Sequence, residues 1–168
     1  MTDGGPARRA RRPTLFVMVG LPASGKTTLA KRLERRHDAL RLTKDDWMMP
    51  LFGWGDFEDK REVVEALLWG MGARALRLGV DVVLDYGLWA RAEREEYRAR
   101  AEALGARVDF RFLDVPEEEL FRRMDERNRR SDPNDVPITA EQLAEYLPRF
   151  QRPAEDELAI WRRLREQD

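Results

Sequence analysis

The first residues able to do chemistry form the run GLPASGKT at residues 20–27. Two glycines separated by four residues and followed by Lys-Thr make up a P-loop, whose backbone N–H groups surround the phosphates of a nucleotide. We expect the ammonium group of Lys26 to contact the β- and γ-phosphates, and the hydroxyl of Thr27 to bind the Mg²⁺ that accompanies them. The pattern therefore predicts a site for ATP with Mg²⁺.

The neighbours of this loop are those that a P-loop requires. An apolar run at residues 15–19 comes directly before it, and a segment of helical character at residues 28–33 follows. In this order the positive N-terminus of the helix faces the phosphates. The alternative, a glycine-bearing turn beside a surface lysine, leaves the order of strand, loop and helix unexplained. The residues expected to bind the nucleotide in this segment are Gly20, Ala23, Ser24, Gly25, Lys26, Thr27 and Thr28.

Carboxylates follow two further predicted strands. Asp45 and Asp46 come after residues 39–43, and Asp85 ends the apolar run at residues 80–84. We expect Asp45 to orient an acceptor hydroxyl and to accept its proton during phosphoryl transfer. Asp85 is expected to hold the magnesium shell or the acceptor. Each could instead cap a local turn or helix, which aspartate does well.

Arginines crowd the end of a predicted helix that opens at Pro116. They are Arg122, Arg123, Arg127, Arg129 and Arg130. Arg123 and Arg127 are four residues apart and therefore share one face of that helix. Guanidinium groups on one face suit a lid, here about residues 116–137, that closes over phosphate oxygens and stabilises the charge of the transition state. The competing interpretation is a solvated helix end whose cations favour the helix macrodipole.

The composition limits the class of protein. With 168 residues, 42% of them hydrophobic, the chain can bury one substantial core, so we expect a single domain at residues 13–168 after a disordered leader at residues 1–12. The net charge of −1 does not favour nucleic acid as an obligatory partner. Binding of nucleic acid would need a local basic site on the surface. There is no cysteine, which excludes thiol catalysis, and no apolar run approaches the roughly 20 residues of a membrane span. We expect a cytoplasmic protein.

Apolar periodicity predicts an α/β fold. Expected strands lie at residues 15–19, 39–43, 80–85 and 107–113, and expected helices alternate with them. Strands separated by helices pair in parallel, so we expect a three-layer P-loop NTPase fold in which helices flank a mostly parallel sheet. Ligands bind at the carboxyl ends of such strands, where the P-loop and the carboxylates converge. After Arg130 the sequence does not predict where a last strand would lie.

Aromatic side chains gather beside two of these segments. They are Trp47, Phe52, Trp54, Phe57 and Trp89. Most such residues pack in cores, but some are expected to line a pocket for an acceptor with a flat apolar body. Residues 44–55 are expected to form a short connection. The single histidine, His37, falls at a predicted helix end and is expected to be structural.

In their order along the chain, the motifs resemble those of the P-loop kinases related to polynucleotide 5′-hydroxyl kinase, chloramphenicol phosphotransferase and the zeta toxins, whose bacterial members are often labelled AAA-family ATPases. The matching segments are GLPASGKTT at 20–28, TKDDW at 43–47, VLDYGLW at 83–89, RAER at 91–94, FLDVP at 112–116 and ELFRR at 119–123. The resemblance covers about residues 14–130 and is carried by several ordered motifs.

The resemblance implies an ATP-dependent phosphotransferase. Lys26 and Thr27 would hold the phosphates and Mg²⁺, and Asp45 would activate the acceptor hydroxyl. Arg123 and Arg127 would belong to the lid, with Arg123 also binding the nucleotide.

One position departs from the polynucleotide kinases. In those enzymes an arginine three residues after the catalytic acid engages the phosphate of the acceptor, whereas this chain has Met48. The departure weakens the case for a nucleic-acid 5′ end and favours a hydroxyl of a small molecule. Two alternatives stay open, a 5′-hydroxyl nucleic-acid kinase and a nucleotide-gated binding protein without transfer activity.

Overall fold

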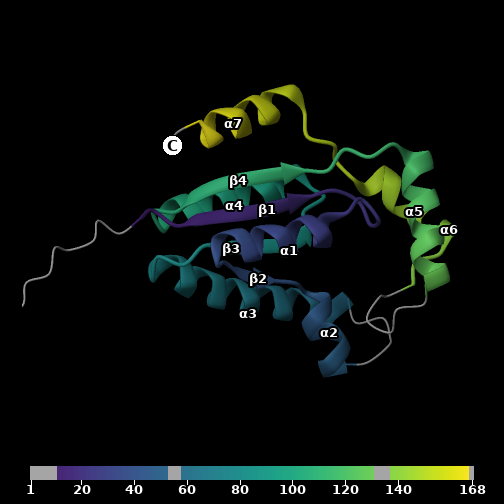
Figure 1. Cartoon of the computed structure of the whole chain (residues 1–168), viewed down its shortest axis with the longest axis horizontal. Helices are drawn as coiled ribbons and strands as arrows, with labels where there is room; N and C mark the ends of the chain where they lie inside the picture. Colours follow the sequence, from purple (N-terminus) through teal and green to yellow (C-terminus); the bar gives the residue numbers. More distant parts are fainter. Residues whose placement is uncertain (1–10, 53–57, 131–136, 167–168) are drawn as a thin grey trace, which may run out of the picture.

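A parallel sheet forms the centre of the molecule (Figure 1). The computed structural model describes residues 11–52, 58–130 and 137–166, and within them the sheet has four strands in the order β2-β3-β1-β4. These are β1 (Thr14–Val19), β2 (Leu40–Leu42), β3 (Val82–Gly87) and β4 (Arg107–Phe112). Each pair of neighbours is parallel, as expected for strands that are joined by helical crossovers.

Helices cover the two faces of the sheet unequally. On one face α1 (Lys26–His37) packs against Phe16 and Met18. The other face is covered by three helices, α3 (Glu58–Arg77), α4 (Arg91–Ala103) and α7 (Glu155–Arg165). The alternation of side chains along β1 sends Leu15 and Val17 into this second, larger core. The prediction of a three-layer α/β fold is confirmed, and of the described helices only α1 forms one of the outer layers.

The remaining helices lie toward the carboxyl ends of the strands (Figure 1). They are α2 (Asp45–Phe52), α5 (Glu117–Arg130), α6 (Ala140–Tyr146) and the short 3₁₀ helix η1 (Leu147–Arg149). A small separate core joins α5 and α6 to the P-loop through Leu120, Met124, Leu143 and Leu21. The helix that carries the predicted lid arginines is therefore packed directly against the nucleotide-binding loop.

Several boundaries differ from those expected. Residues 45–52 form a helix rather than a connection, and the first turn of this helix holds two aspartates, which its macrodipole favours. Asp85 lies inside β3 rather than at its end. Among the described residues after Arg130 there is no strand, and α7 packs against the edge strand β4, with Trp161 stacked on Phe110.

Parts of three predictions fall outside the described residues. These are residues 1–10 of the expected leader, 131–136 of the expected lid, and the aromatic residues Trp54 and Phe57. The end of the expected leader is ordered by contacts, since Arg11 pairs with Asp81 and Arg12 donates to the carbonyl of Gly105 at 2.7 Å. Of the helices in the described ranges, none has the length and hydrophobicity that a membrane crossing requires.

Candidate active site

The P-loop joins β1 to the N-terminus of α1. Gly25 precedes the helix with φ 94°, a left-handed conformation that strains any residue with a Cβ. The backbone N–H of Gly20 donates to the carbonyl of Gly87 at 3.0 Å, which fixes the loop against the end of β3. None of the described side chains caps α1, so its first N–H groups are left to bind an anion.

Lys26 lies folded back into this loop. Its Nζ atom donates to the carbonyl oxygen of Leu21 at 2.6 Å. Burial lowers the pKa of Lys26 to about 8, although the negative charges of Asp85 and Asp45 act in the opposite direction, and the positive charge of Arg127 lowers the pKa further. Residues from β3, α2 and α5 therefore bring their charges close to the P-loop lysine.

Asp85 is a buried carboxylate that lacks hydrogen bonds. Only 7% of the residue is exposed, and neither carboxylate oxygen has a hydrogen-bond partner among the described residues. The nearest cation is the guanidinium of Arg41, whose Nη1 lies 3.6 Å from Oδ2. Burial raises the pKa of Asp85, while the charges of Lys26 and Arg41 and the nearby Thr27 hydroxyl, which does not reach hydrogen-bond geometry, lower it. A carboxylate in this state is suited to a ligand that supplies positive charge.

The donor set here fits Mg²⁺. Mg²⁺ prefers oxygen ligands and is usually held by one or two protein groups together with water and substrate phosphates. Asp85 supplies an unsatisfied carboxylate, and Thr27 supplies a hydroxyl on the first turn of α1. The described part of the chain has no group of three or more histidine, cysteine or acidic side chains able to hold a metal.

The two aspartates that begin α2 differ in their contacts. Asp46 accepts a hydrogen bond from Nη2 of Arg41 at 2.9 Å. Asp45 is exposed and has no hydrogen-bond or ion-pair partner within the described ranges, yet its charge acts on both Lys26 and Asp85. Asp45 is therefore the carboxylate left available at the mouth of the loop.

Arg41 is a site residue that the sequence analysis missed. It lies in the middle of β2, and its side chain also bonds to Thr43 and, at 3.2 Å, to Glu34 on α1. The guanidinium of Arg41 therefore lies between three carboxylates, those of Glu34, Asp46 and Asp85. A single charged residue between Leu40 and Leu42 was the available signal, but its partners lie on other elements.

The predicted lid arginines separate into two groups. Nη1 of Arg123 donates to the carbonyl of Ser24 at 3.4 Å, and the charge of Arg127 reaches Lys26. Arg122 instead pairs with two acidic residues of its own helix, one of which is Glu119. The structure therefore brings Arg123 and Arg127 to the P-loop, as the shared helix face predicts, and turns Arg122 away.

The described aromatic residues are also divided. Trp47 is 42% exposed on α2 near Asp45, whereas Phe52 is partly buried against the main core. Trp89 packs against the ring of Tyr146, with ring centroids 5.1 Å apart. Of the described aromatic residues predicted to line an acceptor pocket, Trp47 is the one that lies exposed beside Asp45.

A buried ion pair fixes the loop that follows β3. Nε of Arg94 donates to Oε1 of Glu157 at 2.6 Å, and Nη2 donates to Oε2 at 3.0 Å. The remaining nitrogen, Nη1, donates to the carbonyl oxygens of Leu88 and Trp89 at 3.3 and 2.9 Å. Through these bonds α4 and α7 together hold the segment that comes directly after the strand carrying Asp85.

Sequence comparison places this site in a family. The family model for the AAA domain matches residues 15–153, which is most of the chain. The chain belongs to this AAA domain family. No curated protein sequence matches this AAA domain.

Solved structures resemble the AAA domain in fold. A chain of the Pnkp1/Rnl/Hen1 RNA repair complex matches 94% of this chain, with TM-score 0.70 and 19% identity, but only 46% of its own length is covered. Chaetomium thermophilum Kti12 in complex with ADP-AlF3 matches with TM-score 0.66 and 18% identity over 91% of this chain and 96% of Kti12. A gluconokinase from Sinorhizobium meliloti matches with TM-score 0.60 and 19% identity over 92% and 90%. These matches confirm the predicted P-loop kinase-like fold.

Proposed function

We propose that this AAA domain is a kinase that uses ATP and Mg²⁺ to phosphorylate a hydroxyl group of a small molecule. The observation that carries the proposal is the grouping of Asp45 and Asp85 around Lys26 at the P-loop. A site that only holds phosphates gains nothing from carboxylates, because negative side chains repel the ligand. The two aspartates are accounted for if one binds the cation that accompanies ATP and the other accepts a proton.

Each residue has one task in the proposed reaction. The N–H groups of residues 20–28 and the ammonium of Lys26 bind the phosphates, and Thr27 and Asp85 are the residues that would hold Mg²⁺. Bound Mg²⁺ neutralises phosphate charge. Asp45 accepts the proton of the acceptor hydroxyl as its oxygen bonds to the γ-phosphorus, and the bond from that phosphorus to ADP breaks.

The arginines of α5 would stabilise the transferring group. Charge spreads over its three equatorial oxygens in the transition state, and guanidinium forks are suited to these oxygens. The contact of Arg123 with the P-loop carbonyl of Ser24 and the effect of Arg127 on Lys26 support this role. Arg123 also pairs with Glu119 at 2.6 Å, a bond within its own helix that can be exchanged for phosphate oxygens.

The surroundings of Asp45 favour an acceptor with little charge. Its neighbours on α2 are the exposed Trp47 and the partly buried Met48, and no cation of α2 is available to bind an acceptor phosphate. The alternative acceptor is the 5′-hydroxyl of a nucleic acid. The fold likeness to a chain of an RNA repair complex suggests this alternative.

The test measures ADP formation from Mg·ATP with separate pools of acceptors. The pools are nucleosides, sugars, hydroxylated antibiotics and 5′-hydroxyl oligonucleotides. Asp45→Asn should lower acceptor-dependent ADP formation by about 10²- to 10⁴-fold, the usual contribution of a general base, and should retain ATP binding. Asp46→Asn is the matched control, because Asp46 lies one residue away but is already engaged by Arg41.

Three results would contradict the proposal in different ways. If no pool raises ADP formation although ATP binds, the nucleotide-gated binding protein becomes the better reading. A response restricted to oligonucleotides would identify the alternative acceptor. If Asp45→Asn transfers phosphate as well as the control variant does, Asp45 is not the base.

A further inference from the structure

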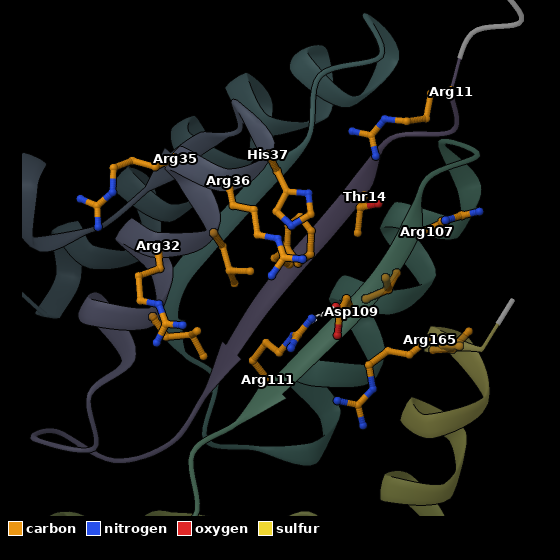
Figure 2. A pocket seen from close by; sticks show the side chains of 15 residues that line it. Arg11, Thr14, Arg32, Arg35, Arg36, His37, Arg107, Asp109, Arg111 and Arg165 are labelled. Carbon is orange, nitrogen blue, oxygen red and sulfur yellow. Dashed lines mark hydrogen bonds and ion pairs between the residues drawn. The ribbon is translucent and has the colours of Figure 1, made fainter. Parts of the chain in front are cut away.

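A second concave surface lies along the C-terminal half of α1, away from the P-loop (Figure 2). It encloses about 680 Å³ and is bounded by residues from the start of the described chain, α1, β4 and the end of α7. We call it the arginine groove. Its basic lining residues are Arg11, Arg32, Arg35, Arg36, Arg107, Arg111 and Arg165, with His37 beside them.

The groove follows from the unequal covering of the sheet. In the register of β1 and β4, Thr14 pairs with Arg107, Phe16 with Asp109 and Met18 with Arg111, so these side chains share one face. On that face α1 packs over β1 and over β3 and β2, which lie on the side of β1 away from β4. The same face of the edge strand β4 therefore stays open, and its side chains there are charged instead of apolar.

The charge of the groove contrasts with that of the whole chain. The sequence carries a net charge of −1, but among the described residues that line the groove Asp109 is the only acidic one. That carboxylate is taken by Arg111, whose Nε and Nη2 both donate to Oδ2, at 3.1 and 2.5 Å. Arg32, Arg36 and Arg165 have no hydrogen-bond or ion-pair partner in the described part of the chain. Their guanidinium groups are available for an anionic ligand.

We propose that the arginine groove binds the phosphodiester backbone of double-helical nucleic acid. Planar guanidinium forks bind phosphate oxygens in pairs, and the available arginines come from two separate helices, which suits a ligand that carries several phosphates in a row. Because the chain as a whole has almost no net charge, it can attract nucleic acid only through a local basic site, and this groove supplies one. The contacts are to phosphates, so binding does not depend on base sequence.

The apolar lining argues against other occupants. Phe16, Leu33 and Val108 are each at most 6% exposed, so the floor offers little surface on which a base could stack, as a single strand would require. A bilayer is flat, whereas the groove is concave. Exposed apolar side chains that could enter a bilayer, such as Val63 and Leu67, lie on α3, which covers the opposite face of the sheet.

The proposed groove is independent of the proposed kinase chemistry. From Lys26 to Arg36 the axis of α1 rises by about 15 Å, so a duplex in the groove does not deliver its end to Asp45. A substitution that abolishes duplex binding in the groove should therefore leave ADP formation at the P-loop unchanged, and the reverse should also hold.

The test measures the fluorescence anisotropy of short labelled RNA and DNA duplexes with the full chain. Arg32→Gln/Arg36→Gln neutralises two of the groove arginines of α1, and the matched control is Arg74→Gln/Arg77→Gln at the corresponding end of α3. We expect the groove variant to bind duplex at least tenfold more weakly, and the control to match the unsubstituted chain. Because each phosphate contact contributes about 0.9 to the slope of log affinity against log salt, the groove variant should show a slope smaller by about 2.

Four results would overturn the proposal. The first is that neither duplex binds at about 50 mM salt. The second is that the control variant loses as much affinity as the groove variant. The third is that a single strand binds more tightly than its duplex, and the fourth is that only anionic vesicles or polyglutamate bind. Thermal unfolding of both variants verifies that each is folded, and ADP formation by both should equal that of the unsubstituted chain.

Discussion

A buried ion pair and a buried carboxylate near the active site differ in whether other side chains satisfy their hydrogen bonds. Arg94 and Glu157 are 1% and 4% exposed, and two parallel hydrogen bonds join them. Asp85 is 7% exposed, and neither of its oxygens has a hydrogen-bond partner among the described residues. Native structures satisfy nearly all their buried polar groups, so an exception points to a ligand or to chemistry. The satisfied pair supports the fold, and the unsatisfied carboxylate is available for function.

The same difference determines how a substitution at each place changes the free energy of unfolding. Removing one partner of a buried pair leaves the other charge without compensation, which strongly destabilises a protein. Asp85 has the guanidinium of Arg41 at 3.6 Å but no hydrogen bond, and burial outweighs this attraction and raises its pKa, so removing its charge relieves a cost of desolvation instead. Substitutions at the two places should therefore change the free energy of unfolding in opposite directions.

The largest effect on stability is expected from Glu157→Gln. The substitution keeps the shape of the side chain but leaves the guanidinium of Arg94 buried without a counter-charge. We expect the free energy of unfolding to fall by about 3–5 kcal/mol. Urea denaturation followed by circular dichroism measures this change.

The neighbouring pair of Arg91 and Asp156 supplies the control. It joins the same two helices at 2.7 Å, but both side chains are well exposed. Asp156→Asn should leave the urea midpoint unchanged, because exposed ion pairs contribute little. Equal losses in Glu157→Gln and Asp156→Asn would show that burial does not distinguish the two pairs.

Asp85→Asn should lower activity and raise stability. We expect acceptor-dependent ADP formation to fall by about 10²-fold, since the variant loses the proposed carboxylate ligand of Mg²⁺. The pKa of Asp85 is raised by burial, so the folded state binds its proton more tightly than the unfolded state does. The charged carboxylate therefore costs stability at neutral pH, and this cost disappears as the pH falls below its ordinary pKa of 3.8.

Thermal unfolding at several pH values tests the stability part of this prediction. The variant should be the more stable protein at neutral pH, and its advantage over the unsubstituted chain should shrink as the pH falls. A variant that is less stable at neutral pH would mean that Asp85 already has a stabilising partner in the free protein.

A smaller effect concerns the pH dependence of nucleotide binding. With a pKa of about 8 in the free protein, Lys26 loses its charge as the pH rises through that value, far below the 10.5 of an ordinary lysine. Calorimetry with Mg²⁺-free ADP should show binding up to about tenfold weaker at about pH 9 than at about pH 7. In Asp85→Asn the weakening should begin at lower pH, because the charge of Asp85 is the largest that raises the pKa of Lys26. A dissociation constant that is unchanged across this range would contradict the prediction.

Features whose residues follow one another in the chain could be predicted from the sequence. The P-loop, the strand before it and the helix after it are encoded within one stretch, so local composition is sufficient. Apolar residues recur at helical spacing over about residues 57–78 and Gly79 follows them, which predicts the helix observed at Glu58–Arg77. Helix α2 was missed because Pro50 lies inside it, and proline normally argues against a helix interior.

Long-range partners could not be predicted in the same way. Arg94 and Glu157 are 63 positions apart, and nothing in either local sequence specifies the other. The network of Arg41 likewise depends on how β2 pairs with β3 and on where α1 ends. The expected alternation of strand and helix also gives no reason for α7, rather than another strand, to lie along β4.

The contact between Gly20 and Gly87 limits how this sequence can diverge. A Cβ at Gly87 would lie 3.2 Å from the carbonyl oxygen of Gly20 and 3.2 Å from Cε of Lys26, and a Cβ at Gly20 would lie 2.9 Å from Oγ of Ser24. Neither position can accept a side chain unless its neighbours shift. Tolerance to mutation at Gly87 is thus set by the P-loop, more than 60 residues earlier in the chain, and the two segments must vary together.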